Sequence, residues 1–287
     1  KAKPTDRLEN YTYLTYYQIC SFQKITSMKT RVVVIPIYQK EFNAFEEYSL
    51  KQTFRIFHKE NLAIVTYSRL LPIVKRQLIF QSCPNLKIEI FDEFYFVHGT
   101  KGYNMLLLSP QFYTRFSSYE YMLICQTDAM PFRNELDDWC KQGFDIIGAP
   151  SVHHGSYLYN GGFSLRRIPS FLDFTSNTKL FCISFMKYNH RYIKDGIGAY
   201  IHLRSFFKAL LIRYGVKILV KVKNEDIIFS RIPFFAKPSD EDAKRFAFEY
   251  NPEILYEDLS KQLPFGCHAW QLPCNYSFWK KVLSLGI

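Results

Sequence analysis

The stretch of sequence that decides the fold runs Tyr121-Met122-Leu123-Ile124-Cys125-Gln126-Thr127-Asp128-Ala129. Its first five residues are all apolar, which is typical of a strand buried on both faces of a sheet. We therefore predict a core strand over 121–126 that ends in a short polar segment with one carboxylate, Asp128. Ligands of open α/β sheets bind at the carboxyl ends of the strands, so Asp128 is a candidate ligand-binding residue. The structural alternative is a turn or helix-cap aspartate, which is common after strands.

Strands and helices alternate on either side of this stretch. The pattern predicts further strands at 32–36, 62–66, 87–91 and 144–147, and helices at 43–57, 103–116 and 134–143. Asn43 and Glu46 match a capping box, Pro110 is a kink or boundary, and Asn134 would cap its helix. Strands separated by helices indicate βαβ units, so we expect an α/β fold with a central, mostly parallel sheet.

The first 27 residues differ from the rest of the chain. They are polar and rich in Tyr and Thr, without a clean period, and Met28 then precedes the first predicted strand. We expect residues 1–27 to be an N-terminal extension and residues 28–287 to form the α/β domain. A peripheral helix packed on that domain is an equally good interpretation of residues 1–27.

Composition limits the class of protein without choosing a function. The formal net charge of +11 predicts an anionic partner, and nucleic acid, an anionic membrane and a diphosphate-bearing substrate all qualify. Seven cysteines, an odd number with no CxxC pair, indicate reduced thiols in a cytosol rather than a disulfide framework or a zinc site. No uncharged apolar run is long enough to span a bilayer, and no signal peptide is visible, so we expect a cytoplasmic protein.

Three further motifs carry chemistry-bearing residues. In Asn160-Gly161-Gly162-Phe163-Ser164-Leu165-Arg166, the glycines allow close approach of a ligand to the backbone, although Asn-Gly more often forms a hairpin turn. Asn224-Glu225-Asp226 offers paired carboxylates for general-base work or metal binding, or acidic residues at a helix N-terminus. In Pro264-Phe265-Gly266-Cys267-His268-Ala269-Trp270, His268 is a candidate metal or diphosphate ligand, or a structural residue. Cys267 would point to the opposite face of a strand from His268.

The order of these motifs resembles that of the glycosyltransferase-like proteins encoded in capsule and lipopolysaccharide gene clusters. The similarity covers about Lys29 to Trp270. The matching segments are Gln126 to Ala129, Phe132 to Trp139, Gly148 to Pro150, Asn160 to Arg166, Glu225-Asp226 and Pro264 to Trp270.

This resemblance implies a GT-A fold, which is a nucleotide-binding α/β sandwich with an acceptor-binding C-terminal half, and it implies a nucleotide-sugar donor. GT-A enzymes usually hold a divalent ion with an Asp-x-Asp pattern, and here Gln126 replaces the first aspartate. The resemblance then implies that Asp128 and His268 bind Mn²⁺ or Mg²⁺, and that Gln126 and Thr127 contact the donor. The same comparison places the nucleotide base and ribose near Pro36 and Tyr38.

The chemistry that the resemblance implies is displacement at the anomeric carbon of the donor sugar. An inverting enzyme needs a carboxylate base, for which Asp226 is the first candidate and Glu225 the second. Asn160, Gly161 and Gly162 would shape the sugar pocket.

The implied acceptor is a saccharide or a lipid-linked glycan in surface polysaccharide synthesis. The segment 202–223 interleaves apolar and basic residues, so it could contact an anionic membrane at the inner face. A solvated basic face of an ordinary amphipathic helix followed by a strand is the alternative interpretation.

Three other functions remain as alternatives. Nucleic-acid binding rests on the charge and the many aromatic residues, but no compact basic run or known binding motif is present, so we expect no nucleic-acid partner. A non-catalytic transferase-like scaffold is suggested by Gln126 in place of aspartate. A metal-dependent hydrolase is a weaker third alternative.

Overall fold

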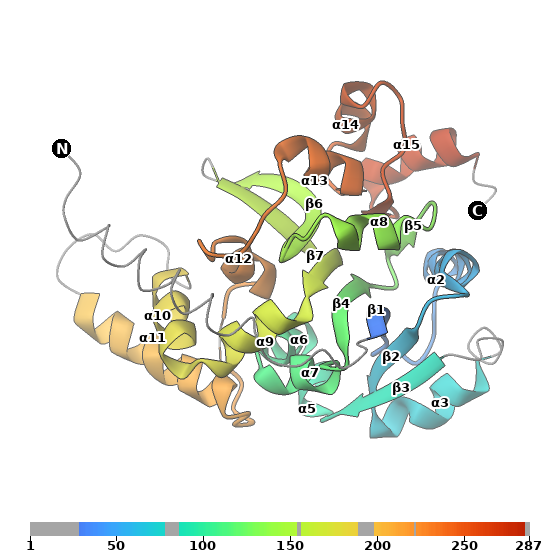
Figure 1. Cartoon of the computed structure of the whole chain (residues 1–287). Coiled ribbons are helices and arrows are strands. Elements are labelled where there is room, and N and C mark those ends of the chain that lie inside the picture. Colours follow the sequence, from blue (N-terminus) through green and yellow to red (C-terminus); the bar gives the residue numbers. More distant parts are fainter. Residues whose placement is uncertain (1–28, 78–85, 154–155, 189–197, 221, 285–287) are drawn as a thin grey trace, which may run out of the picture.

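The computed structural model describes residues 29–77, 86–153, 156–188, 198–220 and 222–284 (Figure 1). The extension expected at residues 1–27 lies outside the described residues. The strands are β1 (Lys29–Pro36), β2 (Leu62–Tyr67), β3 (Leu86–Phe91), β4 (Tyr119–Cys125), β5 (Ala129–Pro131), β6 (Ile146–His153), β7 (Ser156–Arg167), β8 (Ala247–Phe248) and β9 (Gly266–His268).

The helices surround these strands (Figure 1). Those that come before β6 are α2 (Ala44–Phe57), the 3₁₀ helix η1 (Ser68–Leu70), α3 (Leu71–Arg76), α5 (Phe94–Val97), α6 (Gly99–Leu107), α7 (Pro110–Arg115) and α8 (Leu136–Lys141). Those that follow β7 are α9 (Ile168–Ser176), α10 (Thr178–Tyr188), α11 (Gly198–Arg213), α12 (Glu225–Ser230), α13 (Asp240–Phe246), α14 (Pro252–Asp258) and α15 (Pro273–Leu283).

The central sheet has the strand order β3-β2-β1-β4-β7-β6. β1 pairs in parallel with β2 and β4, and β2 pairs in parallel with β3, whereas β7 is antiparallel to both of its neighbours. The expected α/β fold with a mostly parallel central sheet is therefore confirmed. The five predicted strands all exist, as β1, β2, β3, β4 and β6, although the one expected at 144–147 begins later and is longer, as β6.

The helix boundaries follow from local chemistry. Asn43 and Glu46 form the predicted capping box at the start of α2, whose Leu50, Phe54 and Phe57 are buried. Each such buried side chain contributes about 2 kcal/mol of hydrophobic stabilisation. The helix predicted over 103–116 is divided before Pro110 into α6 and α7.

Two local predictions were wrong. The N-cap of α8 is Glu135 rather than Asn134, whose side chain accepts a hydrogen bond from Leu136 N at 3.4 Å. The hairpin-turn alternative for Asn160-Gly161-Gly162 is also wrong, because these residues lie inside β7. Residues 160–163 form a bulge there, because they lie opposite the single residue Ala149 of β6. Such bulges re-aim side chains and are common beside functional sites.

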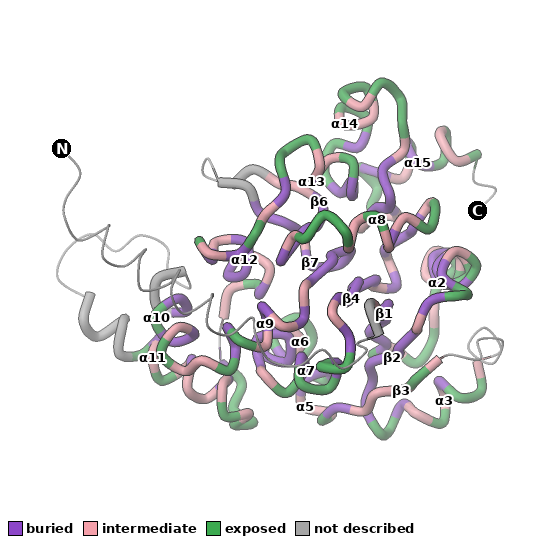
Figure 2. The backbone as a smooth tube through the Cα atoms, viewed as in Figure 1, coloured by how far each residue is buried: buried purple, intermediate pink, exposed green. Residues whose placement is uncertain are grey.

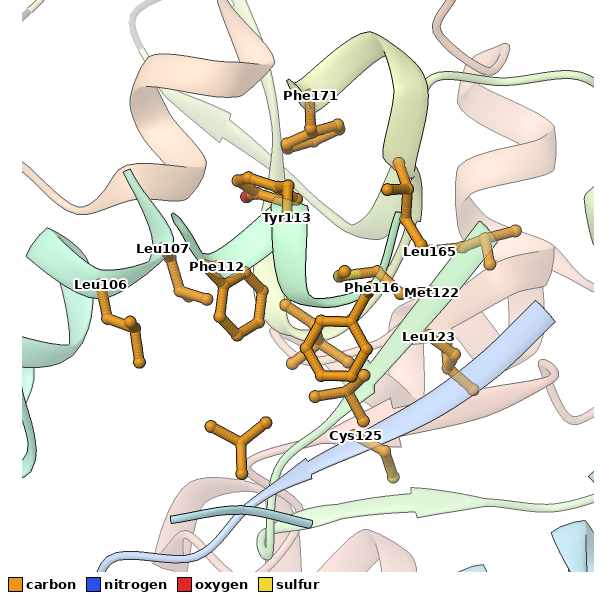
Figure 3. Packing of buried hydrophobic residues seen from close by; sticks show 14 of the residues in the cluster. Leu106, Leu107, Phe112, Tyr113, Phe116, Met122, Leu123, Cys125, Leu165 and Phe171 are labelled. Carbon is orange, nitrogen blue, oxygen red and sulfur yellow. The ribbon is translucent and has the colours of Figure 1, made fainter. Parts of the chain in front are cut away.

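The main core lies between the sheet and the helices that cover it. Figure 3 shows Phe112 and Tyr113 of α7, and Phe116 at its C-terminal end, packed against strand residues such as Met122 and Leu165. Burial is continuous along the central strands, and exposed residues are concentrated on the outer helices and loops (Figure 2). The aromatic-rich composition thus serves chiefly to fill this core.

A second, smaller sheet has the strand order β5-β9-β8 and packs on its own apolar cluster, which includes Trp270 and Trp279. β5 begins immediately after Asp128, and β9 ends at His268. Ala129 and His268 are partners in the antiparallel pairing of these two strands. The small sheet therefore brings two segments that are 140 residues apart in the sequence to one end of β4.

Candidate functional site

Asp128 and His268 meet where β4 leaves the central sheet. The chain continues from Cys125 into Gln126, whose backbone N–H donates to the Gly162 carbonyl at 2.9 Å. Asp128 then lies beside the end of β9, with its Oδ1 atom 3.2 Å from Nε2 of His268. The structure thus brings together the two residues predicted as metal ligands, and both side chains keep some exposure to solvent.

Behind His268 lies a buried carboxylate, Glu249, which directly follows β8. Its Oε1 atom is 3.2 Å from Nδ1 of His268 and accepts a hydrogen bond from Nδ2 of Asn160 at 2.9 Å. Asn160 in turn accepts a hydrogen bond from the Gly162 backbone N–H at 2.7 Å, and Asn275 donates to the Glu249 carbonyl at 2.8 Å. The His268 imidazole is therefore held at Nδ1 by Glu249, which is itself fixed by hydrogen bonds from Asn160 and Asn275.

The charges of Asp128 and Glu249 act strongly on the pKa of His268. Burial disfavours the imidazolium, but the hydrogen bonds and negative charges of Asp128 and Glu249 outweigh burial and raise the pKa of His268 to about 10. Burial likewise opposes ionisation of Asp128, while the nearby His268 lowers the pKa of that carboxyl below its ordinary value. When no other cation is bound, protonated His268 thus supplies the positive charge between the carboxylates of Asp128 and Glu249.

Gly162 is required at its position by the His268 ring. A Cβ atom built there would lie 2.1 Å from Nε2 of His268, which is far inside van der Waals contact. A Cβ at the neighbouring Gly161 would lie 2.6 Å from Oε1 of Glu225. The two glycines therefore let the bulged strand pass between the His268 ring and the start of α12.

Asp226 lies on the other side of the same bulge. Its Oδ1 atom accepts from Ile227 N at 2.7 Å and its Oδ2 atom from Gly161 N at 3.3 Å. Burial, reinforced by the negative charge of Glu225, raises the pKa of Asp226 to about 7. A carboxylate with this pKa is well matched to proton transfer near neutral pH.

Glu225, the second candidate base, has a different environment. It is buried and forms an ion pair with the fully buried Arg166, with 2.8 Å between Oε1 and Nη2. Arg166 also donates to Tyr113 Oη at 3.1 Å and to Ser164 Oγ at 3.2 Å. Glu225 is therefore the counter-ion of Arg166.

The end of β1 and the segment after it contain the residues that were expected to contact the nucleotide. Pro36 is the last residue of β1, and Tyr38 is 47% exposed. Burial of its hydroxyl, together with the charges of Asp128 and Glu46, raises the pKa of Tyr38. Thr127 is buried, where it accepts from Gln39 Nε2 at 3.2 Å and donates to Glu46 Oε1 at 3.1 Å. Tyr38 and Thr127 thus lie at the same end of the sheet as Asp128.

Sequence reasoning missed Glu249 and the pair formed by Gln39 and Glu46. Glu249 follows a strand of only two residues, and no sequence pattern connects it with His268. Glu46 was interpreted only as a capping-box residue, although its carboxylate also accepts a hydrogen bond from Gln39. A signal for Gln39 existed, because it follows the carboxyl end of a predicted core strand.

The donor set fits a hard divalent cation that also binds substrate phosphates. Among the described residues, no group of three or more His, Cys, Asp or Glu side chains could hold an ion by itself. Asp128 and His268 supply an oxygen and a nitrogen, and Oε1 of Gln126 lies 3.2 Å from the same Nε2 atom. Mg²⁺ and Mn²⁺ commonly take one or two protein carboxylates and complete their coordination with phosphates and water.

A separate cavity of about 350 Å³ lies between α13, α14 and the start of α8. It shares none of the candidate-site residues described above. Its arginines are already paired, Arg133 with Glu135 and Arg245 with Glu241. This cavity therefore has no evident chemistry of its own.

Comparison with protein families gives one match. The model of the family described as "Protein of unknown function (DUF5672)" matches residues 85–268. The chain belongs to this family. The DUF5672 match begins just before β3 and ends at His268, so it contains Asp128, Asp226 and Glu249 but neither Pro36 nor Tyr38.

No curated protein matches this DUF5672 chain. Solved structures similar to it include the galactosyltransferase LgtC in complex with donor and acceptor sugar analogues, at 12% identity and a TM-score of 0.48, covering 89% of this chain and 96% of that one. The apo glycosyltransferase GlyE of Streptococcus pneumoniae matches at 12% identity, 88% and 60% coverage and a TM-score of 0.44. Mouse xyloside xylosyltransferase 1, also apo, matches at 11% identity, 83% and 96% coverage and a TM-score of 0.42.

Proposed function

We propose that this DUF5672 protein is a nucleotide-sugar-dependent glycosyltransferase of the GT-A type. The observation that carries the proposal is the arrangement at the carboxyl end of β4. Asp128 and His268 lie on one side of the bulged Gly161-Gly162 backbone, and Asp226 lies on the other. A diphosphate site and a base on the two sides of one short backbone segment suit transfer of a sugar between them.

Asp128 and His268 would hold Mn²⁺ or Mg²⁺, with Gln126 as a further oxygen donor. The bound ion would offset the negative charge that develops on the departing diphosphate. Glu249 is well placed to fix the tautomer in which Nδ1 carries the proton and Nε2 faces the ion. A carboxylate behind a ligating histidine is the usual arrangement in metal sites.

Asp226 would act as the general base. The acceptor hydroxyl attacks the anomeric carbon of the donor sugar, its proton passes to the Asp226 carboxylate, and the bond from that carbon to the diphosphate oxygen breaks. Attack from the side opposite the diphosphate inverts the anomeric configuration. The two backbone N–H groups that donate to Asp226 orient the carboxylate, and the raised pKa lets it accept a proton near pH 7.

The remaining donor contacts follow from the same arrangement. Tyr38, exposed beyond the end of β1, would stack on the nucleotide base, and Gln126 and Thr127 would contact the ribose and diphosphate. Asn160, Gly161 and Gly162 would shape the sugar pocket, because the two glycines let the His268 ring and the Glu225 carboxylate pack directly against this backbone.

The acceptor that we propose is a saccharide or lipid-linked glycan in surface polysaccharide synthesis, reached from the inner face of the membrane. The test is release of nucleoside diphosphate from a panel of sugar nucleotides, with and without Mn²⁺ and candidate acceptors. We expect turnover with one donor class that is lost in Asp128→Ala and in Asp226→Asn. Full turnover in Asp226→Asn would refute the assignment of the base, and binding of donor without any turnover would favour the scaffold alternative.

A further inference from the structure

Exposed apolar side chains are most frequent, along the described sequence, in the second half of α11 and the loop that follows it. Five of the eleven large hydrophobic residues exposed on the described chain fall between positions 207 and 219. They are Phe207 (56% exposed), Tyr214 (68%), Val216 (37%), Ile218 (55%) and Leu219 (41%). We name residues 204–219 the apolar–basic segment. Large apolar patches on a soluble surface commonly mark an interaction site.

The local structure holds these side chains outward. Gly215 adopts the left-handed conformation with φ of 65°, and Val216 N donates to the Leu211 carbonyl at 2.8 Å while Gly215 N donates to that of Ile212 at 3.0 Å. This is a Schellman end to the helix, which reverses the chain direction. The strand that the sequence suggested after the helix does not form at residues 216–220. Ile218 and Leu219 therefore stay exposed instead of entering a sheet.

Positive charge accompanies the apolar surface. The sequence from Gly196 to Asn224 contains no Asp or Glu, and the apolar–basic segment itself contains Arg204, Lys208, Arg213 and Lys217. Lys217 forms an ion pair with Asp92, which attaches the segment to the start of α5. A mixture of exposed apolar and basic side chains complements a bilayer surface with anionic headgroups.

The segment cannot be a membrane span, because none of the helices that the structure describes is both long enough and apolar enough to cross a bilayer. Its position in the chain is informative, since Asp226 follows Leu219 by only seven residues. A surface that touches the membrane here would lie close in the chain to the proposed base.

We propose that the apolar–basic segment docks this protein on an anionic lipid bilayer, with Phe207 and Ile218 inserted at the headgroup boundary. The proposal rests on the proposed function only for the purpose of docking, which is to give the site access to a lipid-linked acceptor. The docking itself needs no donor and no turnover.

The test is co-sedimentation of the intact chain with vesicles of phosphatidylcholine, with or without phosphatidylglycerol. The wild-type protein should pellet with the anionic vesicles and remain in solution with the neutral ones, and added salt should weaken its binding. The double variant Phe207→Ser, Ile218→Ser should bind anionic vesicles about tenfold more weakly or worse, since two inserted apolar side chains are lost. Both side chains are exposed, so its melting temperature should equal that of the wild type.

A matched control is available at the opposite end of the molecule (Figure 1). Ile254 of α14 and Leu272 are 61% and 43% exposed, and Ile254→Ser, Leu272→Ser should bind vesicles like the wild type. Equal binding by both double variants, no binding of the wild type to either vesicle, or a wild-type dimer that only Phe207→Ser, Ile218→Ser abolishes would overturn the proposal. Nucleoside diphosphate release from a soluble assay, without vesicles, reports separately on the proposed function.

Discussion

Replacement of Asp226 by asparagine tests the electrostatics of the proposed base. The pKa of Asp226 is about 7 in the folded protein, against an ordinary value of 3.8. The folded protein therefore retains a proton that the unfolded chain releases, and its stability falls as pH rises from about 4 to about 7. Asparagine does not titrate, so the Asp226→Asn variant lacks this contribution to the decrease in stability with rising pH.

The size of this pH-dependent change in stability follows from the shift in the pKa of Asp226. A displacement of about three pKa units corresponds to roughly 4 kcal/mol at most, and partial access of water to this carboxyl reduces it to about 2 kcal/mol. About three-fifths of that loss develops between pH 5 and pH 8.5. We therefore expect the stability of Asp226→Asn, relative to the wild type, to rise by about 1 kcal/mol over this range.

The measurement is urea unfolding of both proteins at pH 5 and pH 8.5. His268 also titrates differently in the folded and unfolded chains, but it does so in both proteins and cancels in the comparison. The same variant should lose at least about 100-fold in transfer rate while it keeps its stabilisation by the donor. An identical dependence of stability on pH in the two proteins would refute the reasoning about burial and Glu225.

Three further substitutions test the surroundings of the site. Gly162→Ala should displace the His268 ring and abolish stabilisation by Mn²⁺ with a nucleoside diphosphate, and unchanged stabilisation would contradict the close packing seen here. Glu249→Gln should weaken Mn²⁺ binding by about 10- to 100-fold in calorimetry, because the histidine loses its charged support, and wild-type affinity would remove Glu249 from the site. Arg166→Met should lower the free energy of unfolding by about 3–5 kcal/mol, since it leaves the charge of Glu225 buried without a partner. Adding Glu225→Leu to this variant should recover much of the loss, and no recovery would mean that the ion pair is not the source of the effect.

The central strands were predictable because their signal is local. The apolar runs that end at Pro36 and Cys125 are buried on both faces, so each run is continuous and needs no knowledge of its neighbours. The capping box at Asn43 is equally local. The bulge in β7 was not predictable, since it depends on how residues 160–163 pair with a strand more than ten residues earlier.

The candidate site likewise contains residues that were predictable from the sequence and residues that were not. Asp128 was identifiable as a candidate from its position at a strand end, and the structure places its carboxylate beside His268. That the two residues bind a metal ion stays a prediction. Glu249 was not identifiable, because its role comes from two hydrogen bonds to segments 19 and 89 residues away. The choice of Asp226 rather than Glu225 as the proposed base likewise had no physical ground in the sequence, because the ion pair between Glu225 and Arg166 is visible only in the structure.

Binding of a nucleoside diphosphate at Asp128 and His268 is the claim on which the proposed function depends. The most direct test is the thermal stabilisation of the protein by a panel of nucleoside diphosphates and sugar nucleotides, each with and without Mn²⁺. We predict a rise in melting temperature with one nucleotide class that Mn²⁺ enhances and that Asp128→Ala abolishes. The absence of any rise with these ligands, together with clear stabilisation by oligonucleotides, would contradict the transferase account and favour nucleic-acid binding.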